Sequence, residues 1–288
     1  MLLPRFEFHE PHTLEDACRL MGELGEKARP LAGGTDLLVN MKKKILAPEH
    51  LVSLGRIEPI GELSSDNDGL RLGAALTAAQ IAESADVRER FPALAEGASR
   101  LGSPLIRNLA TVAGNLASAR PAADFPPPLI AYGARVVVRN ASGDRTLPVE
   151  ELFRGPGATS LGPDDLLEAV QLDALEERSG AAYIKLGVRQ TLEISLVNVA
   201  AYLGLENKTI QTARIVLGSV APTPIRAPAA EKTLIGESPS PALFAKAAEA
   251  ASEDAKPIDD FRASAAYRRD MVRTLTRRAL ETALARVA

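Results

Sequence analysis

The sequence predicts an α+β protein, because its β-hairpins and helices occupy separate stretches instead of alternating as they do in a doubly wound parallel sheet. Two β-rich runs, residues 195–205 and 209–217, flank the polar turn Glu206–Lys208 and predict a hairpin. Apolar residues at helical spacing in other stretches, above all near the C-terminus, predict the helices. The chain has 288 residues and is 46% hydrophobic, which is sufficient for a sizeable core.

The first segment, about residues 1–57, is expected to contain two helices and two strands. Thr13 is placed to cap a helix over Leu14–Leu24, and Gly25 ends it. The other elements predicted here are a strand over Arg29–Ala32, a helix running through Leu37, Leu38, Met41 and Ile45, and a strand over Leu51–Leu54.

The second segment, about residues 58–176, begins with a hairpin turn at Asp66-Asn67-Asp68-Gly69. Thr77 and Gln80 have the spacing of a capping box, which predicts that a helix starts there. Residues 103–131 are rich in Gly, Pro, Asn and Ala and are predicted to form a long connection, of the kind that builds a site. The remaining elements are strands over Leu70–Gly73, Arg135–Arg139 and Leu166–Leu172, and a helix over Ala93–Leu101.

The third segment begins after the polar turn Glu176–Gly180, which we take as a domain boundary. The prediction is therefore a first domain over 1–176, with subdomains at about 1–57 and 58–176, and a C-terminal domain over 177–288. The chain closes with a long helix from about Ala265 to Val287. A basic face on this helix is predicted from Arg262, Arg268, Arg269, Arg273, Arg277 and Arg278. We interpret it as a solvated face, and a surface for a partner subunit is the alternative.

Composition excludes several classes of function. The net charge of −3 and the absence of Trp argue against a nucleic-acid-binding protein. Cys18 is the only cysteine, so this chain alone cannot form a disulfide, a cysteine zinc site or an iron–sulfur cluster. His9, His12 and His50 stand apart from any carboxylate or cysteine cluster, and no metal site is predicted. Without a transmembrane run or a signal peptide, a cytoplasmic protein is expected.

The first candidate site is a glycine-rich loop at a strand-to-helix junction. Two glycines there allow backbone N–H groups to approach a phosphate closely, and the start of the helix favours an anion. The alternative is a tight turn in which Thr35 only caps the helix. The loop consists of Leu31, Ala32, Gly33, Gly34, Thr35, Asp36 and Leu37.

The second candidate is a loop of small and polar residues within 107–117, with Asp124 shortly after it. A hydroxyl, an amide and a glycine in one short loop can supply several hydrogen bonds to phosphate or sugar oxygens. The alternative is a loop that small residues merely keep compact. Its central residues are Thr111, Val112, Ala113, Gly114 and Asn115.

The usual nucleotide-binding signatures are missing. The sequence contains neither G-x-G-x-x-G after a strand nor G-x-x-x-x-G-K-[ST], which argues against a Rossmann or P-loop site. Gly155-Pro156-Gly157 is a lone G-x-G and is interpreted as a turn.

Taken together, the two loops and their separation resemble the FAD-binding medium subunit of the molybdenum hydroxylases, such as xanthine dehydrogenase, carbon monoxide dehydrogenase and 4-hydroxybenzoyl-CoA reductase. The resemblance covers essentially the whole chain. Its other motifs are Phe6-Glu7-Phe8-His9-Glu10-Pro11, Pro48-Glu49-His50-Leu51-Val52 and Tyr267-Arg268-Arg269. It implies a FAD-binding fold of the p-cresol methylhydroxylase/MurB type in two subdomains, followed by a C-terminal α+β domain.

The resemblance also implies the residues that hold the cofactor. Residues 31–37 and 111–115 match the family's two pyrophosphate loops, and Asp124 matches an acidic residue near the flavin nucleotide. Leu101 and Leu167 match apolar flavin contacts, and Lys185 matches a basic one that could stabilise an anionic reduced flavin; a solvated lysine is the alternative. No histidine or cysteine lies in either loop, so noncovalent FAD is expected.

Two features depart from the family. Val112 and Ala113 stand where the family usually has Ile and Gly, and a methyl group at Ala113 restricts the approach of the backbone. Residues 116–124 run on without a cysteine, so the [4Fe–4S] loop of the 4-hydroxybenzoyl-CoA reductase branch is absent from this stretch.

The implied function is electron transfer in an oxidoreductase complex. A large molybdenum subunit oxidises the substrate, [2Fe–2S] clusters of a small subunit pass electrons to FAD in this chain, and NAD or a quinone accepts them. The expected assembly is a heterotrimer that pairs into a dimer of heterotrimers. Two alternatives stay open at this point: a self-contained FAD-dependent oxidase or reductase of the same fold, and a nucleotide-binding scaffold in which FAD is structural.

Overall fold

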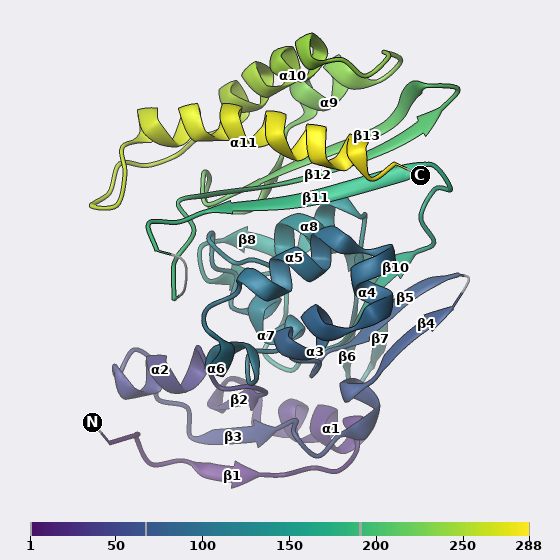
Figure 1. Ribbon diagram of the computed structural model, residues 1–288. Helices are drawn as coiled ribbons and strands as arrows, with labels where there is room; N and C mark the ends of the chain where they lie inside the picture. Colours follow the sequence, from purple (N-terminus) through teal and green to yellow (C-terminus); the bar gives the residue numbers. More distant parts are fainter. Residues whose placement is uncertain (1, 67, 190–191, 288) are drawn as a thin grey trace.

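The structure is a computed structural model that describes residues 2–66, 68–189 and 192–287. Its strands form sheets of three, five and four strands and one two-stranded ribbon, and helices pack between and beyond the sheets (Figure 1). The chain builds them in sequence order, from the N-terminal end at the bottom of Figure 1 to the C-terminal helices at the top. The α+β prediction is confirmed.

The N-terminal part is a small parallel sheet with the order β1-β3-β2. Helix α1 begins where the Thr13 side chain accepts a hydrogen bond from the Asp16 N–H, and it ends at Gly25, whose φ is +54°. The second helix stops three residues before Ile45, because the chain turns to a positive φ of 59° at Lys44. The elements are β1 (Glu7–His9), α1 (Leu14–Leu24), η1 (Gly25–Lys27), β2 (Ala28–Leu31), α2 (Leu37–Lys42) and β3 (His50–Ser53).

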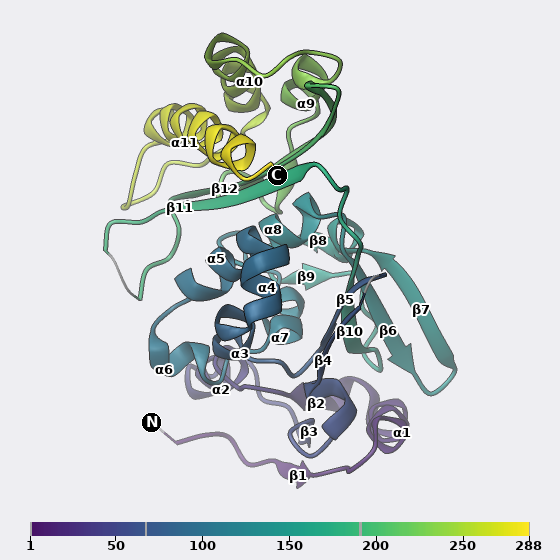
Figure 2. The same ribbon diagram turned by 45° about the vertical axis from the view of Figure 1, so that its right-hand side comes forward.

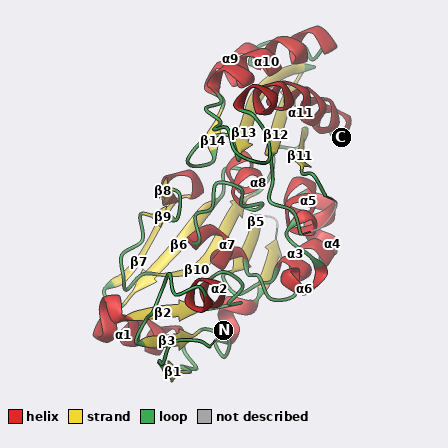
Figure 3. Cartoon of the chain, turned by 90° about the vertical axis from the view of Figure 1, so that its left-hand side faces the viewer, coloured by secondary structure: helices red, strands yellow, loops and turns green. Residues whose placement is uncertain are grey.

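The middle part is an antiparallel sheet with the order β4-β5-β10-β6-β7 (Figure 3). The hairpin between β4 and β5 is confirmed, although position 67 of its turn lies outside the described residues. The capping box at Thr77 is also present. The strands are β4 (Leu63–Asp66), β5 (Gly69–Gly73), β6 (Arg135–Asn140), β7 (Gly143–Pro148), β8 (Phe153–Gly155), β9 (Ala158–Thr159) and β10 (Leu166–Asp173). Gly155-Pro156-Gly157 forms the turn of the β8–β9 ribbon.

The predicted long connection over residues 103–131 is not a plain loop, because the structure forms three short helices there. The hydroxyl groups of Ser103 and Thr111 cap the first two helices, and prolines occupy first-turn positions, where a missing N–H costs little. The helices of this part are η2 (Glu58–Gly61), α3 (Ala78–Glu83), α4 (Ala85–Arg90), α5 (Pro92–Arg100), α6 (Pro104–Arg107), α7 (Val112–Ala117), α8 (Pro126–Ala131) and η3 (Val149–Leu152).

The C-terminal part is an antiparallel sheet with both faces covered. Helices α10 and α11 lie above it in Figures 1 and 2, and α5 and α8 lie below it. Alternate residues therefore enter different cores: Tyr183 packs below the sheet, whereas Ala182 packs above it. The predicted hairpin is confirmed. The elements are β11 (Ser179–Leu186), β12 (Val197–Glu206), β13 (Thr209–Gly218), β14 (Ile225–Arg226), α9 (Pro228–Leu234), α10 (Pro241–Asp254) and α11 (Ala265–Ala285).

The predicted basic face of the last helix needs correction at two arginines. Arg262 precedes α11, which begins at Ala265. Arg268 is only 2% exposed, and its guanidinium donates hydrogen bonds to the Leu196 and Ser219 carbonyl groups and to Asp260. It therefore joins α11 to the sheet. In the part of the chain that the structure describes, no helix is both long and apolar enough to span a membrane.

Candidate functional site

A cavity of about 1180 Å³ lies where the three parts of the chain meet. The loop after β2 and the start of α7 form two of its walls, and the start of β10 forms a third. The C-terminal part contributes lining residues such as Ile194, Ser219 and Arg268. The volume exceeds the roughly 300–1,000 Å³ that is common for small-ligand sites, so a dinucleotide-sized ligand has room.

The first glycine loop has the geometry of an anion site. The N–H groups of residues 33–36 donate no hydrogen bond to any residue that the structure describes. Gly33 lies against the carbonyl of Leu109, so that an added Cβ would sit 1.7 Å from that oxygen. Gly34 has a φ of +69°, which glycine adopts readily and β-branched residues do not. The two glycines thus allow the loop to pack closely and leave its N–H groups available.

The second loop differs, because its N–H groups already have partners. Those of residues 112 and 113 donate to the Leu76 and Ala74 carbonyl groups at 2.9 and 3.2 Å. Those of residues 114 and 115 donate to the Oγ1 and the carbonyl oxygen of Thr111. Because the N–H at position 113 points to Ala74, this loop can contribute side-chain groups of Thr111 and Asn115 more readily than backbone N–H groups of 112–115.

A buried ion pair lies beside the cavity. Asp124 accepts a hydrogen bond of 2.7 Å from the Tyr183 hydroxyl and one of 2.9 Å from the Lys185 Nζ. The two charged side chains are 7% and 6% exposed. Burial raises the pKa of the Asp124 carboxyl above its ordinary value, and the Lys185 ammonium opposes that shift. Burial also raises the pKa of Tyr183, so its hydroxyl stays protonated and donates to Asp124.

Most of the sixteen predicted residues line this one cavity. Those that do are Ala32, Gly33, Gly34, Thr35, Asp36, Leu37, Leu101, Thr111, Ala113, Gly114, Asn115, Asp124 and Leu167. Leu31 and Val112 are not among the lining residues, and Val112 is fully buried. Lys185 does not line the cavity either, and the alternative of a solvated lysine is wrong, because its Nζ bonds to Asp124 and to the Arg100 carbonyl.

Sequence reasoning missed several polar residues of the site. Tyr183 could have been found, because it lies two residues before Lys185 on a strand and therefore on the same face. Arg120 lines the cavity and pairs with Asp36 at 3.3 Å, a contact between distant segments that no local pattern indicates. The Nε of Arg268 and the Oγ of Ser219 are buried without a hydrogen-bond partner among the described residues.

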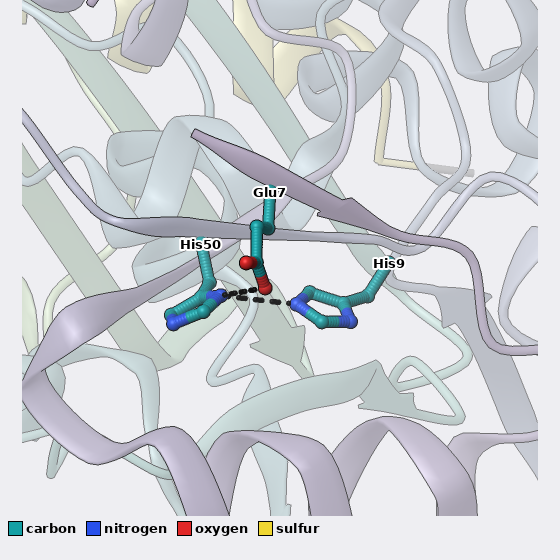
Figure 4. Close-up of side chains that lie close together, drawn as sticks. All are labelled: Glu7, His9 and His50. Carbon is teal, nitrogen blue, oxygen red and sulfur yellow. Dashed lines mark hydrogen bonds and ion pairs between the residues drawn. The ribbon is translucent and has the colours of Figure 1, made fainter. Parts of the chain in front are cut away.

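The histidines also need correction. Parallel pairing of β1 with β3 sets Glu7 opposite His50, and His9 follows two residues along the same strand. The three side chains therefore share one face of the sheet and meet (Figure 4). The prediction that the histidines stand apart from carboxylates is wrong for His9 and His50, because it considered only positions along the chain.

Comparison with known proteins gives the family. Residues 4–173 match the FAD binding domain in molybdopterin dehydrogenase, and residues 182–283 match the CO dehydrogenase flavoprotein C-terminal domain. The chain belongs to this family of FAD-binding medium subunits. It is 33% identical over all of both chains to the carbon monoxide dehydrogenase medium chain of Hydrogenophaga pseudoflava. It is 31% identical over 96% of both chains to the xanthine dehydrogenase FAD-binding subunit of Escherichia coli O157:H7.

Solved structures of the family agree over the full length. Carbon monoxide dehydrogenase from Hydrogenophaga pseudoflava, solved without the Mo-pyranopterin moiety of its molybdenum cofactor, superposes with a TM-score of 0.96 at 34% identity, covering 100% of both chains. Quinoline 2-oxidoreductase from Pseudomonas putida 86 gives a TM-score of 0.92 at 25% identity, covering 99% of both chains. The resemblance found in the sequence is confirmed, and this medium subunit is the flavoprotein component of an oxidoreductase complex.

The cavity fits the FAD of this family. The N–H groups of residues 33–36, which have no partner among the described residues, suit a pyrophosphate, because backbone N–H groups and anions form strong charge-assisted hydrogen bonds. Arg268 and Ser219 also line the cavity and add polar side chains to its wall. The side chains of Leu101 and Leu167 give the cavity an apolar surface against which the flavin ring system can pack.

Proposed function

We propose that this medium subunit binds noncovalent FAD in the cavity and relays electrons from [2Fe–2S] clusters of a small partner subunit to an acceptor such as NAD or a quinone. The observation that carries the proposal is a loop, residues 33–36, that lines a dinucleotide-sized cavity in a chain of the FAD-binding family. The N–H groups of this loop have no hydrogen-bond partner in the part of the chain that the structure describes. Bound FAD supplies reversible two-electron and one-electron chemistry. The protein's part is to bind, orient and shield it.

Each wall of the cavity has a role in this proposal. The N–H groups of residues 33–36 hold the pyrophosphate, and Thr111 and Asn115 contribute side-chain hydrogen bonds from the second loop. Asp124 accepts a hydrogen bond from the nucleotide part, while Lys185 and Tyr183 fix its carboxylate. Lys185 thus acts through Asp124 as a positioning residue, and its ammonium favours negative charge nearby.

Exposed apolar residues at the rim of the cavity support the proposal that a partner subunit docks there. Val39, Ile45 and Ile194 line the cavity and are nevertheless 43%, 66% and 57% exposed. Exposed apolar side chains around an opening favour docking of another protein surface. We assign this rim to the small iron–sulfur subunit, which would sit close enough to the flavin for electron transfer. A large molybdenum subunit completes the proposed cytoplasmic heterotrimer, which pairs into a dimer, and the chain divides at about residue 176.

Acid precipitation of the protein is expected to release the flavin, chemically unchanged, into solution. No histidine, cysteine or tyrosine is among the described residues that line the cavity, and Cys18 is buried on α1, so no usual attachment group faces the ring. The measurement is flavin absorbance in the supernatant and in the washed pellet. Flavin retained in the denatured pellet would contradict noncovalent binding.

Reduction of the flavin by the organic substrate is expected only when the partner subunits are present. The isolated chain should contain FAD without stoichiometric iron or molybdenum, and dithionite should still bleach its flavin band. Adding the cluster-bearing and molybdenum subunits should make bleaching depend on the substrate. Stopped-flow absorbance of the flavin band, with and without the partners, measures this.

The same experiment separates the alternatives. Substrate-driven bleaching by this chain alone would favour a self-contained oxidase or reductase. A flavin that dithionite cannot reduce would favour a structural cofactor. Bleaching that needs the partners supports the relay.

A further inference from the structure

The Glu7–His9–His50 cluster joins β1, the edge strand of the parallel sheet, to β3, its central strand, and takes no part in the cavity. The Nε2 of His9 lies 3.1 Å from the Nδ1 of His50, and that same Nδ1 lies 3.3 Å from the Oε2 of Glu7 (Figure 4). All three candidate ligand atoms lie within 4.8 Å of one another. None of the three residues is among those that line the cavity.

These separations suit a tetrahedral metal ion. With metal–nitrogen bonds of 2.0–2.1 Å, two ligand atoms of a tetrahedral site lie about 3.3 Å apart. The observed distances of 3.1 and 3.3 Å between ligand atoms agree with that value. Imidazole nitrogens and a carboxylate are also the ligand types that Zn²⁺ accepts. In the absence of an ion, two facing ring nitrogens can share only one proton, whereas a metal ion would satisfy both.

Strand pairing holds the three candidate ligand side chains close together without a bound ion. Glu7 and His50 are register partners in adjacent parallel strands, and His9 is two residues from Glu7, so the pleat directs all three to one face. His50 is 16% exposed at its side chain and is held by the sheet, whereas Glu7 is 75% exposed and can adjust. Water can therefore reach a fourth coordination position.

We propose that Glu7, His9 and His50 form a binding site for one divalent transition-metal ion of the zinc class, with water as the fourth ligand. His9 binds through Nε2, His50 through Nδ1 and Glu7 through a carboxylate oxygen. The site joins the three-residue edge strand β1 to β3, so it stabilises the start of the chain and has no role in flavin chemistry.

The test uses the untagged full-length chain with its flavin and titrates it with Co²⁺, whose visible absorption reports tetrahedral coordination. The parent is expected to bind one equivalent, which Zn²⁺ displaces. His9→Ala should weaken binding by more than the roughly 10–100-fold that loss of an outer-shell partner costs. Glu7→Gln should weaken it as well. His12→Ala, which changes a histidine outside the cluster, should bind like the parent.

Flavin content provides an independent check that each variant is folded, because the cluster lies outside the cavity. If His9→Ala loses its flavin, Glu7→Gln replaces it as the deciding variant. A parent without tetrahedral Co²⁺ absorption would overturn the proposal. So would a folded His9→Ala or Glu7→Gln that binds Co²⁺ like the parent, because the ion would then lie elsewhere.

Discussion

Gly34→Val is expected to raise the Kd for FAD at least about 100-fold, since backbone strain costs about 1–3 kcal/mol and each charge-assisted hydrogen bond lost about as much again. Gly34 has a φ of +69°, and a β-branched residue avoids that region. The nearby Leu38 side chain, 2.9 Å from an added Cβ, can move aside, but the backbone must change to relieve the strain. That change moves the N–H groups of residues 33–36, which line the cavity. Fluorescence titration of the apoprotein with FAD measures the change.

Gly236→Val is the matched control. Gly236 also has a positive φ, +85°, but an added Cβ there meets nothing within 4 Å, and the residue is not among those that line the cavity. The control therefore carries similar backbone strain and should bind FAD like the parent. If both variants lose FAD equally, general destabilisation explains the loss. If Gly34→Val binds FAD like the parent, the first loop is not the pyrophosphate site.

Lys185→Met is expected to lower the free energy of unfolding by about 3–5 kcal/mol, because it leaves the buried Asp124 carboxylate without its cationic partner. Methionine preserves most of the side-chain volume, so the loss reports charge more than packing. Urea unfolding of the apoprotein measures the change. Lys246→Met is the matched control, because that lysine is exposed on α10 and should change stability by less than about 0.5 kcal/mol.

The effect should depend on pH with a defined sign. Burial already raises the pKa of Asp124 above its ordinary value of 3.8, so stability is lost as the pH rises through the folded-state pKa. Removing Lys185 raises the folded-state pKa of Asp124 further, and stability is then lost over a wider pH range. The deficit of Lys185→Met should therefore be largest at neutral pH and shrink as the solution is acidified.

The double variant Asp124→Asn/Lys185→Met identifies the cause. Asn is uncharged but can still accept the hydrogen bond from Tyr183, so the double variant should recover most of the stability lost at neutral pH. A double variant as unstable at neutral pH as Lys185→Met would show that packing around Lys185, and not the unpaired charge, explains the loss.

Local chemistry explains which elements the sequence predicted well. Helix α1 begins after Thr13 and ends at Gly25 as expected, since capping and a positive φ are properties of single residues. The segment over 103–131 was predicted poorly, because its helices are short and depend on hydroxyl caps and surrounding contacts more than on periodicity. The buried position of Arg268 was missed for a similar reason, since its partners are distant carbonyl groups.

The family and the two glycine loops can be recognised in the sequence alone, because those motifs depend on residue type and order. The tertiary structure was needed to show how the loops differ. Within residues 2–66, 68–189 and 192–287, the N–H groups of residues 33–36 have no partner, whereas those of residues 112–115 are bonded within the protein. The tertiary structure also shows that Lys185 contacts Asp124 and that His9 meets His50. Strand pairing and burial bring those residues together from distant positions, and neither can be read from local spacing.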